Sequence, residues 1–147
     1  MTRMRTSLRR VTERDLRQIF EWRRSPQVRK QMISRSVITW RGHKRFWAKR
    51  LRSENPSFIV RFDGQDAGLV RLDAVENAHE VGICINPKMH GKGIGSAALA
   101  EVVKLARKKN LKKLLARIKL GNAASHRIFE KIGFKPIYMT YELRLKK

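Results

Sequence analysis

The feature that most constrains the fold of this chain is a glycine-rich segment near its centre, His-Gly-Lys-Gly-Ile-Gly-Ser at residues 90–96. It lies between a run of strand-forming residues, 80–85, and an apolar-periodic stretch typical of a helix. Glycines let the backbone approach a ligand closely, and the following helix offers free N–H groups and the positive end of its dipole. Together with Lys92, this arrangement predicts a phosphate-binding turn. The alternative is a tight strand-to-helix turn that needs its glycines only for steric reasons.

Two common phosphate-binding loops do not fit this segment. Residues 93–98 match the dinucleotide fingerprint Gly-x-Gly-x-x-Ala, but no acidic residue lies between Glu101 and Glu130 to bind the ribose. The chain also has no Gly-Lys-Ser/Thr triplet, which excludes a Walker loop. A different phosphate-binding family is therefore expected.

The rest of the chain predicts an α+β fold in a single domain, 1–147, with a mostly antiparallel sheet. Asp63-Gly64 predicts a hairpin turn, and Thr12 and Thr39 are expected to cap helices. Strands are expected over residues 6–10, 57–62, 67–72, 80–85 and 114–118, with one or two more over 134–145. Helical segments are expected between 12 and 25, over 28–32, after 39, after 93, and over 122–132.

The charge of the chain is strongly positive and unevenly distributed. Its 147 residues include 35 Lys or Arg and 12 Asp or Glu, a net charge of +23. Residues 1–50 carry 16 basic and 3 acidic side chains, residues 51–98 carry 5 and 6, and residues 99–147 carry 14 and 3. A near-neutral centre thus separates two basic ends. The charge predicts an anionic partner: a nucleic acid, a nucleotide-bearing small molecule or acidic lipid headgroups.

The composition also excludes several classes of protein. The single cysteine, Cys84, excludes a disulfide framework and any multi-cysteine metal site, and the four histidines lack metal-ligand spacing, so no metal is expected. The sequence has no run of about 18 apolar residues, so no membrane span is expected. Residues 1–10 lack the apolar stretch of a secretory signal. A cytoplasmic protein is expected.

Two segments resemble the GCN5-related N-acetyltransferase (GNAT) superfamily. His90-Gly91-Lys92-Gly93-Ile94-Gly95 resembles its acetyl-CoA pyrophosphate loop, with His90 in place of the usual Arg or Gln. Asn122-Ala123-Ala124-Ser125, followed by Phe129 to Phe134, is similar to its C-terminal segment. Residues 20–30 and 39–43 are similar to the acetyltransferases of nucleotide-linked amino sugars, the pseudaminic-acid pathway type, and to the ribosomal-protein N-terminal acetyltransferases.

The resemblance implies a mixed, mostly antiparallel central sheet flanked by helices, with acetyl-CoA as cosubstrate. The loop would bind the pyrophosphate, the end of strand 80–85 would line the pantetheine and thioester, and Asn122 would hold the pantetheine arm. Phe129 stands where many members have a tyrosine that protonates the leaving thiolate. The implied acetyl-CoA residues are Cys84, Ile85, Asn86, His90, Gly91, Lys92, Gly93, Ile94, Gly95, Ser96, Asn122 and Phe129.

Glu80 and Tyr138 are the candidate catalytic residues. Strand alternation places Glu80, Gly82 and Cys84 on one face, where a carboxylate suits a general base for the amine. A surface carboxylate is the alternative for Glu80. Tyr138 is a candidate for the missing proton donor, with a packing role as its alternative. Cys84 is not expected to act as a nucleophile, because no base is evident beside it.

The resemblance places the amine acceptor against the N-terminal helices. The candidate acceptor residues there are Trp22, Arg23, Arg29 and Lys30, and their alternative is a solvated basic surface. The expected reaction is direct transfer of acetyl to a primary amine of an anionic small molecule, such as a nucleotide-linked amino sugar. The alternatives are a protein- or ribosome-associated N-acetyltransferase, and a nucleic-acid-binding module of the same fold with little catalysis. No oligomeric state is predicted.

Overall fold

A single five-stranded sheet organises the protein, which is seen here in a computed structural model that describes residues 5–34 and 36–145. The strands follow the order β1-β2-β3-β4-β5. The first four are antiparallel neighbours, and β5 runs parallel to β4. Their bounds are β1 Thr6–Arg10, β2 Ser57–Phe62, β3 Gln65–Val75, β4 Ala78–Ile85 and β5 Leu114–Leu115. The expected α+β fold with a mostly antiparallel sheet is confirmed.

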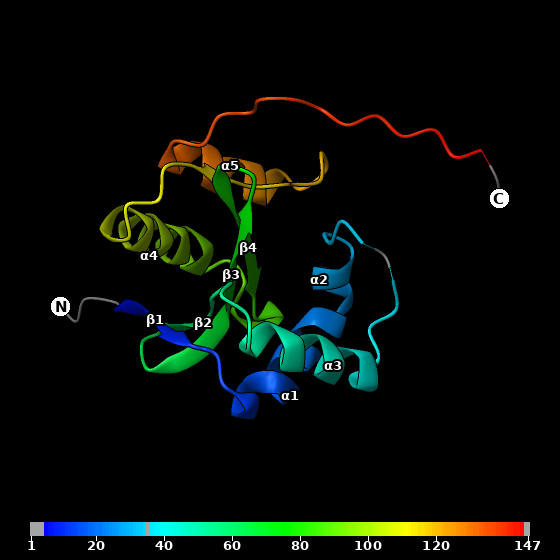
Figure 1. The fold of residues 1–147 in the computed structure, drawn as a ribbon, viewed down its shortest axis with the longest axis vertical. Helices are drawn as coiled ribbons and strands as arrows, with labels where there is room; N and C mark the ends of the chain where they lie inside the picture. The colour runs from blue at the N-terminus through cyan, green and yellow to red at the C-terminus, as the bar shows by residue number, and fades with distance from the viewer. Residues whose placement is uncertain (1–4, 35, 146–147) are drawn as a thin grey trace.

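Helices cover both faces of the sheet (Figure 1). The longest, α4, begins at Ile94, within the glycine-rich segment, and packs against α5 and the sheet. Helices α1 and α3 pack on the opposite face. The α-helices are α1 Leu16–Arg24, α2 Pro26–Arg29, α3 Trp40–Leu51, α4 Ile94–Lys108 and α5 Ala123–Ile132, with short 3-10 turns at Glu13–Asp15 and Pro87–Met89.

The alternation of strand residues builds two hydrophobic cores. Along β3, Val70 and Leu72 enter the core under α4 and α5, whereas Leu69 enters the core under α1 and α3. Trp22 and Trp47 fill this second core and are almost completely buried. Core packing therefore explains these two tryptophans.

Local signals also form as expected. Asp63 and Gly64 have φ values of 51° and 79°, as a two-residue hairpin turn requires. The Thr39 hydroxyl accepts a hydrogen bond from the Gly42 N–H and caps α3. Thr12 and Asp15 form a capping box before α1. Within the described residues, no helix is long and apolar enough to cross a membrane.

Three expected elements differ in the structure. The helical turn expected at 28–32 lies at Pro26–Arg29, because Pro26 takes the favoured first helical position. The strand expected over 114–118 stops at Leu115, where its pairing with β4 ends. The strands expected over 134–145 are absent: no backbone hydrogen bond joins residues 135–145 to any other described residue. A strand needs a neighbouring backbone, and strand propensity alone does not supply one.

Candidate active site

The glycine-rich segment forms a turn whose backbone donors are free. Gly91 and Gly93 have φ values of 81° and 76°, in the left-handed region that favours glycine. No atom lies within 4 Å of the position a Cβ would take on either residue, so their outer surface is open. Among the described residues, the backbone N–H groups of residues 91–96 have no acceptor, and the first paired one after the turn is Ala97, which donates to Gly93. Six donors therefore surround the start of α4, as a diphosphate site requires.

The third glycine has a different role. A Cβ on Gly95 would lie 3.1 Å from the Ile128 side chain of α5 and 4.0 Å from the Ile85 side chain of β4. Gly95 therefore allows α4 to approach the sheet and α5 closely. Lys92 is exposed in the turn, and the His90 ring Nε2 lies 3.1 Å from the Ile85 carbonyl oxygen. His90 thus joins the turn to the end of β4.

The edge of β4 beyond its pairing with β5 exposes further donors. The His79 N–H donates to the Lys113 carbonyl on the β5 side. Because N–H directions alternate along a strand, the N–H groups of Ile83 and Ile85 point to the same side. Pairing between β4 and β5 extends only to Glu80 and Leu115, so these two donors lie beyond it. They are suited to an extended chain or a developing oxyanion laid along β4.

Three predicted residues have their side chains on one face of β4. Glu80, Gly82 and Cys84 lie opposite Asp73, Arg71 and Leu69 of β3, on the face covered by α1 and α3. Their neighbours Val81 and Ile83 pack in the core under α4, as alternation predicts.

Glu80 is tied to a cation. The Arg117 Nε donates a 2.9 Å hydrogen bond to Glu80 Oε1, and the Glu80 side chain is 24% exposed. Glu80 therefore retains contact with solvent at one end of the strand face. This position allows a proton to pass from an amine to the carboxylate through water.

Cys84 is an unreactive thiol. Desolvation raises its pKa to about 11, against the opposing effect of the positive charges on Arg23 and Arg71. A thiol with this pKa is protonated at neutral pH and is a weak nucleophile. The expectation that Cys84 does not act covalently agrees with this.

Three other predicted residues have structural contacts. The Asn122 Oδ1 caps α5 by accepting from the Ser125 N–H. Phe129 is buried in the core and makes an edge contact with Phe134 at 4.9 Å between ring centroids. Tyr138 lies on the C-terminal segment with 72% of its surface exposed, and the structure does not bring it to β4. Within the described residues, no group of three or more His, Cys, Asp or Glu side chains is placed to hold a metal.

The acceptor candidates divide between core and surface. Trp22 is buried, while Arg29 and Lys30 are exposed and line a shallow hollow with Arg24 and Pro26. The Lys119 Nζ donates a 2.7 Å hydrogen bond to the Lys30 carbonyl oxygen. This bond connects the segment after α2 to the chain that follows β5.

Arg71 is a half-buried cation beside the predicted residues of β4 that was not predicted as a site residue from the sequence. It lies on β3 opposite Gly82, and a Cβ on Gly82 would be 3.9 Å from its Nε. Arg71 is the one charged residue of the predicted strand 67–72, and this is the sequence signal that could have identified it. Desolvation lowers the pKa of Arg71 to about 10, with a contribution from the charge of Arg23. Desolvation also lowers the pKa of Arg23.

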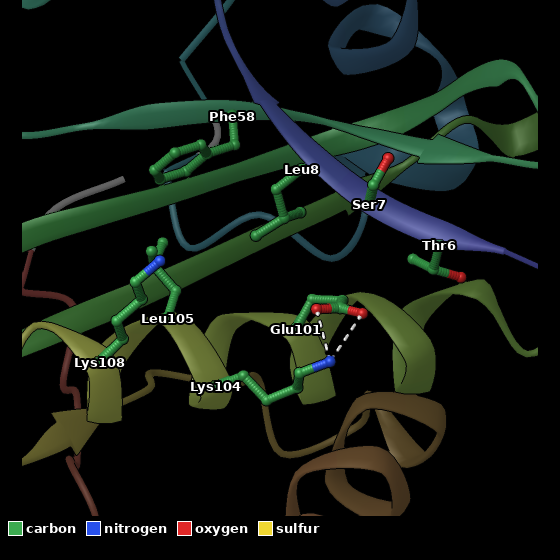
Figure 2. Close-up of a pocket in the computed structure, with 8 residues that line it drawn as sticks. All are labelled: Thr6, Ser7, Leu8, Phe58, Glu101, Lys104, Leu105 and Lys108. Atoms are coloured by element: carbon green, nitrogen blue, oxygen red, sulfur yellow. Dashed lines mark hydrogen bonds and ion pairs between the residues drawn. The ribbon is translucent and has the colours of Figure 1, made fainter.

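A second hollow lies between β1 and α4, away from the glycine turn (Figure 2). Its α4 residues begin with Glu101, seven positions after the start of the helix, or about 10 Å along the axis. Figure 2 shows Glu101 paired with Lys104, and the rest of the wall includes the apolar Leu8, Phe58 and Leu105. None of the predicted site residues lines it.

Comparison with known proteins supports one family. The acetyltransferase (GNAT) domain family matches residues 5–135. An uncharacterized protein of Methanocaldococcus jannaschii is 29% identical over 133 residues, which cover 87% of this chain but 28% of the relative. The chain thus spans less than a third of that relative. A solved domain from the same organism is 26% identical, with a TM-score of 0.84 over 95% of this chain and 94% of the domain.

A likeness of fold alone extends to an enzyme solved with its ligands. The spermidine N-acetyltransferase from Vibrio cholerae, in complex with CoA and spermine, is 19% identical. Its TM-score is 0.79, over 87% of this chain and 79% of that chain.

Proposed function

The chain belongs to the acetyltransferase (GNAT) domain family, and from this premise we propose that it transfers acetyl from acetyl-CoA directly to a primary amine of an anionic small molecule, such as a nucleotide-linked amino sugar. The observation that carries the proposal is the turn between β4 and α4. Its six free N–H groups and two left-handed glycines fit a diphosphate, and the exposed Lys92 adds a charge contact. The residues present therefore suit the CoA pyrophosphate.

The edge of β4 suits the transfer step. Acetyl-CoA, when bound, supplies an activated acetyl thioester. The free N–H groups of Ile83 and Ile85 are placed to stabilise negative charge on the carbonyl oxygen under attack. Glu80 accepts the amine proton, directly or through water, since the amine has to be neutral to attack.

Departure of the thiolate needs no tyrosine at position 129. Phe129 is buried and its ring has no proton to donate. A thiol with a pKa near 8.5 is a fair leaving group without specific help. Tyr138 remains the proposed donor if the C-terminal segment closes on the site when acetyl-CoA binds.

The charge on the acceptor side supports an anionic substrate. Arg24, Arg29 and Lys30 line one hollow beside α2. Only Glu21 is acidic among residues 16–50, which carry α1, α2 and α3. A phosphate or carboxylate on the acceptor suits this surface, and a polyamine is repelled by it.

A second candidate function is suggested by the size of the charge. A net charge of +23 exceeds what one small acceptor requires. A protein- or ribosome-associated N-acetyltransferase uses such a surface to bind RNA, and a module without catalysis needs only that surface. Steeply salt-dependent binding of ribosomal RNA, with no acetylation of any amine, would support the module.

Acetyl-CoA binding is tested first. At a hundred times its Kd, acetyl-CoA is expected to stabilise the fold by about 2.7 kcal/mol, which raises the Tm by about 8 °C. No shift at millimolar acetyl-CoA would overturn the proposed function.

An amine screen with detection of the released thiol then identifies the acceptor. It includes nucleotide-linked amino sugars, peptide N-termini and polyamines. Faster release with the anionic sugars than with the polyamines is expected. Preference for peptide N-termini would favour the second candidate function.

A further inference from the structure

Arg23 on α1 and Arg71 on β3 are two half-buried arginines without partners. Neither makes a hydrogen bond or ion pair with any described residue. Both lie close enough to Cys84 for their charges to affect its pKa. Four other arginines near this face of the sheet are paired: Arg9 with Asp15 and Asp66, Arg61 with Asp66, Arg50 with Asp73, and Arg117 with Glu80.

The nearby carboxylates are already engaged. Asp73, two residues from Arg71 on the same face of β3, receives a hydrogen bond from Arg50. The other donors of Arg50 bind the Ser57 hydroxyl and the backbone carbonyls of Pro56 and Leu72. Glu80, two residues from Gly82, is held by Arg117. Among the described residues, neither Asp73 nor Glu80 therefore forms an ion pair with Arg23 or Arg71.

An unpaired guanidinium away from water is costly, and two together are more so. Desolvation and repulsion from Arg23 and Arg50 lower the pKa of Arg71 to about 10, against the opposing charge of Asp73. Both groups nevertheless remain charged at neutral pH. An anion bound by both guanidinium groups would offset the free-energy cost of their partial burial, which no ion pair with a described residue does.

The guanidinium of Arg71 is held in place without using its donors. It lies 5.5 Å from the centroid of the Phe46 ring, in a cation–π contact from α3. On the sheet it crosses Gly82, which has no side chain to occupy that space. The N–H donors of its planar guanidinium therefore remain free to bind an anion. They lie beside Gly82, the neighbour of Ile83, whose N–H is proposed to face the reacting carbonyl.

We propose that Arg23 and Arg71 together bind an acidic group of the acceptor, a carboxylate or a phosphate, on the α1 and α3 side of β4. The assignment rests on the proposed function, because it takes β4 as the place of acetyl transfer. It makes Arg71 a specificity-determining residue. The acidic group would hold the acceptor so that its amine faces the edge of β4 near Ile83.

Protection from an arginine reagent tests the site in the wild-type protein. The protein is saturated with CoA to fill the glycine turn and then treated with phenylglyoxal, with and without inorganic phosphate or malonate. Mass spectrometry maps the modified residues. Arg23 and Arg71 are expected to be protected at least five-fold by one of the two anions, while the exposed Arg107 on α4 is not. Phosphate protection indicates a phosphorylated acceptor, and malonate protection a carboxylate. Absence of protection by either anion would overturn the site.

Variants give an independent readout. Arg71→Gln and Arg23→Gln are each expected to raise the KM of the anionic acceptor found in the screen at least ten-fold. The Tm shift produced by acetyl-CoA stays unchanged, as does catalysis in the control Arg107→Gln. Arg71→Lys, which keeps the charge but loses the fork, recovers part of the loss. A variant that loses the acetyl-CoA shift, or that lowers kcat at unchanged KM, contradicts an acceptor-binding role.

The two levels of the proposal fail differently. A wild-type protein that shows no acetyl-CoA shift overturns the proposed function. A protein that binds acetyl-CoA and acetylates an amine, but shows neither protection nor a KM effect, overturns only the arginine site.

Discussion

Gly93 is the residue at which a left-handed backbone conformation lies within the proposed diphosphate site. Its φ of 76° disfavours any side chain, and its outer surface faces open space at the start of α4. Gly93→Asp adds a side chain and a negative charge among the free N–H groups. We expect this change to abolish the Tm shift given by acetyl-CoA. The carboxylate would fill the proposed diphosphate site and would repel the negative charge of the diphosphate.

Gly64 provides the matched control for this change. Its φ is 79°, and no atom lies within 4 Å of the Cβ position in the β2–β3 hairpin. Gly64→Asp carries the same backbone strain and charge far from α4. The expected result is a modest fall in Tm with the acetyl-CoA shift retained. Equal shifts in both variants would contradict the assignment of the turn.

Glu80 is tested through the pH dependence of turnover. Glu80→Gln is expected to lower kcat by about 10²-fold at neutral pH, the usual contribution of a general base. The loss should shrink as pH rises toward the pKa of the acceptor amine, because a neutral amine needs no base. Steady-state rates from pH 6 to 10 measure this, with the exposed Glu76→Gln as control. A pH-independent loss would indicate that Glu80 only positions Arg117.

At the scale of elements, one carboxylate joins β1 to the start of α1. Asp15 receives hydrogen bonds from both Arg9 nitrogens, at 2.9 and 2.7 Å, from the Thr12 N–H at 2.9 Å and from Gln18 at 3.1 Å. Desolvation alone would raise its pKa, but the hydrogen bonds from Arg9 and Thr12 lower it below the ordinary value. Asp66 extends the same network to β3.

This network predicts a dependence of stability on pH. A carboxyl whose pKa is lower in the folded state stabilises the fold above its unfolded pKa, about 3.9, and loses that contribution as pH falls through the folded pKa. Asp15→Asn is expected to lower stability at pH 7 by about 2 kcal/mol. Its Tm should also fall less than the wild type's between pH 5 and pH 2.

Thermal melts over that pH range provide the measurement. Glu21→Gln on α1 is the control, since Glu21 is exposed and its nearest cation, on Arg24, lies 3.9 Å away. This control is expected to change stability by less than 0.5 kcal/mol, as for most surface substitutions. Parallel pH curves for Asp15→Asn and the wild type would contradict the role of Asp15.

Local signals in the sequence predict the helices and strands well, but they predict poorly which distant segments pack or pair with one another. The bounds of β1 and β2 match the predicted 6–10 and 57–62, because alternation and turn residues lie within each segment. The free donors of Ile83 depend on where β5 stops pairing, which no local pattern records. The approach of Arg23 to Arg71 likewise requires α1 to pack over β3. The glycine turn could therefore be predicted from the sequence, whereas the place of Arg71 beside Arg23 in the proposed acceptor site could not.

At the scale of the whole molecule, the near-neutral and the basic parts of the sequence form different parts of the structure. The near-neutral residues 51–98 form β2, β3, β4 and the glycine turn. The basic residues 1–50 supply α1, α2 and α3, which pack on the face of the sheet that holds Glu80 and Cys84. The N-terminal half of the positive charge thus lies on the side proposed for the acceptor. This distribution supports selection of an anionic substrate, and the basic C-terminal third is left over as a surface for a larger anionic partner.

The C-terminal segment is the other whole-molecule feature, and it leads away from the sheet (Figure 1). Ile137, Tyr138, Met139, Tyr141 and Leu143 are all more than half exposed. Proteases cut such extended, unbonded segments first, whereas the buried aromatic residues become accessible only on unfolding. Chymotrypsin is therefore expected to cut after Tyr138 and Tyr141 before any site within residues 6–134. A time course followed by intact mass measures this, and Tyr138→Thr with Tyr141→Thr should remove the early cuts.

The same time course tests the predicted proton donor. If Tyr138 protonates the leaving thiolate, the segment has to close over β4 when acetyl-CoA is bound, and the bond after Tyr138 should become protected. Tyr141, three residues further along the segment, provides an internal comparison. Slower cutting after Tyr138 with acetyl-CoA than without it would support the donor. An unchanged rate at saturating acetyl-CoA would contradict it and leave the thiolate to depart unassisted, as the buried Phe129 already suggests.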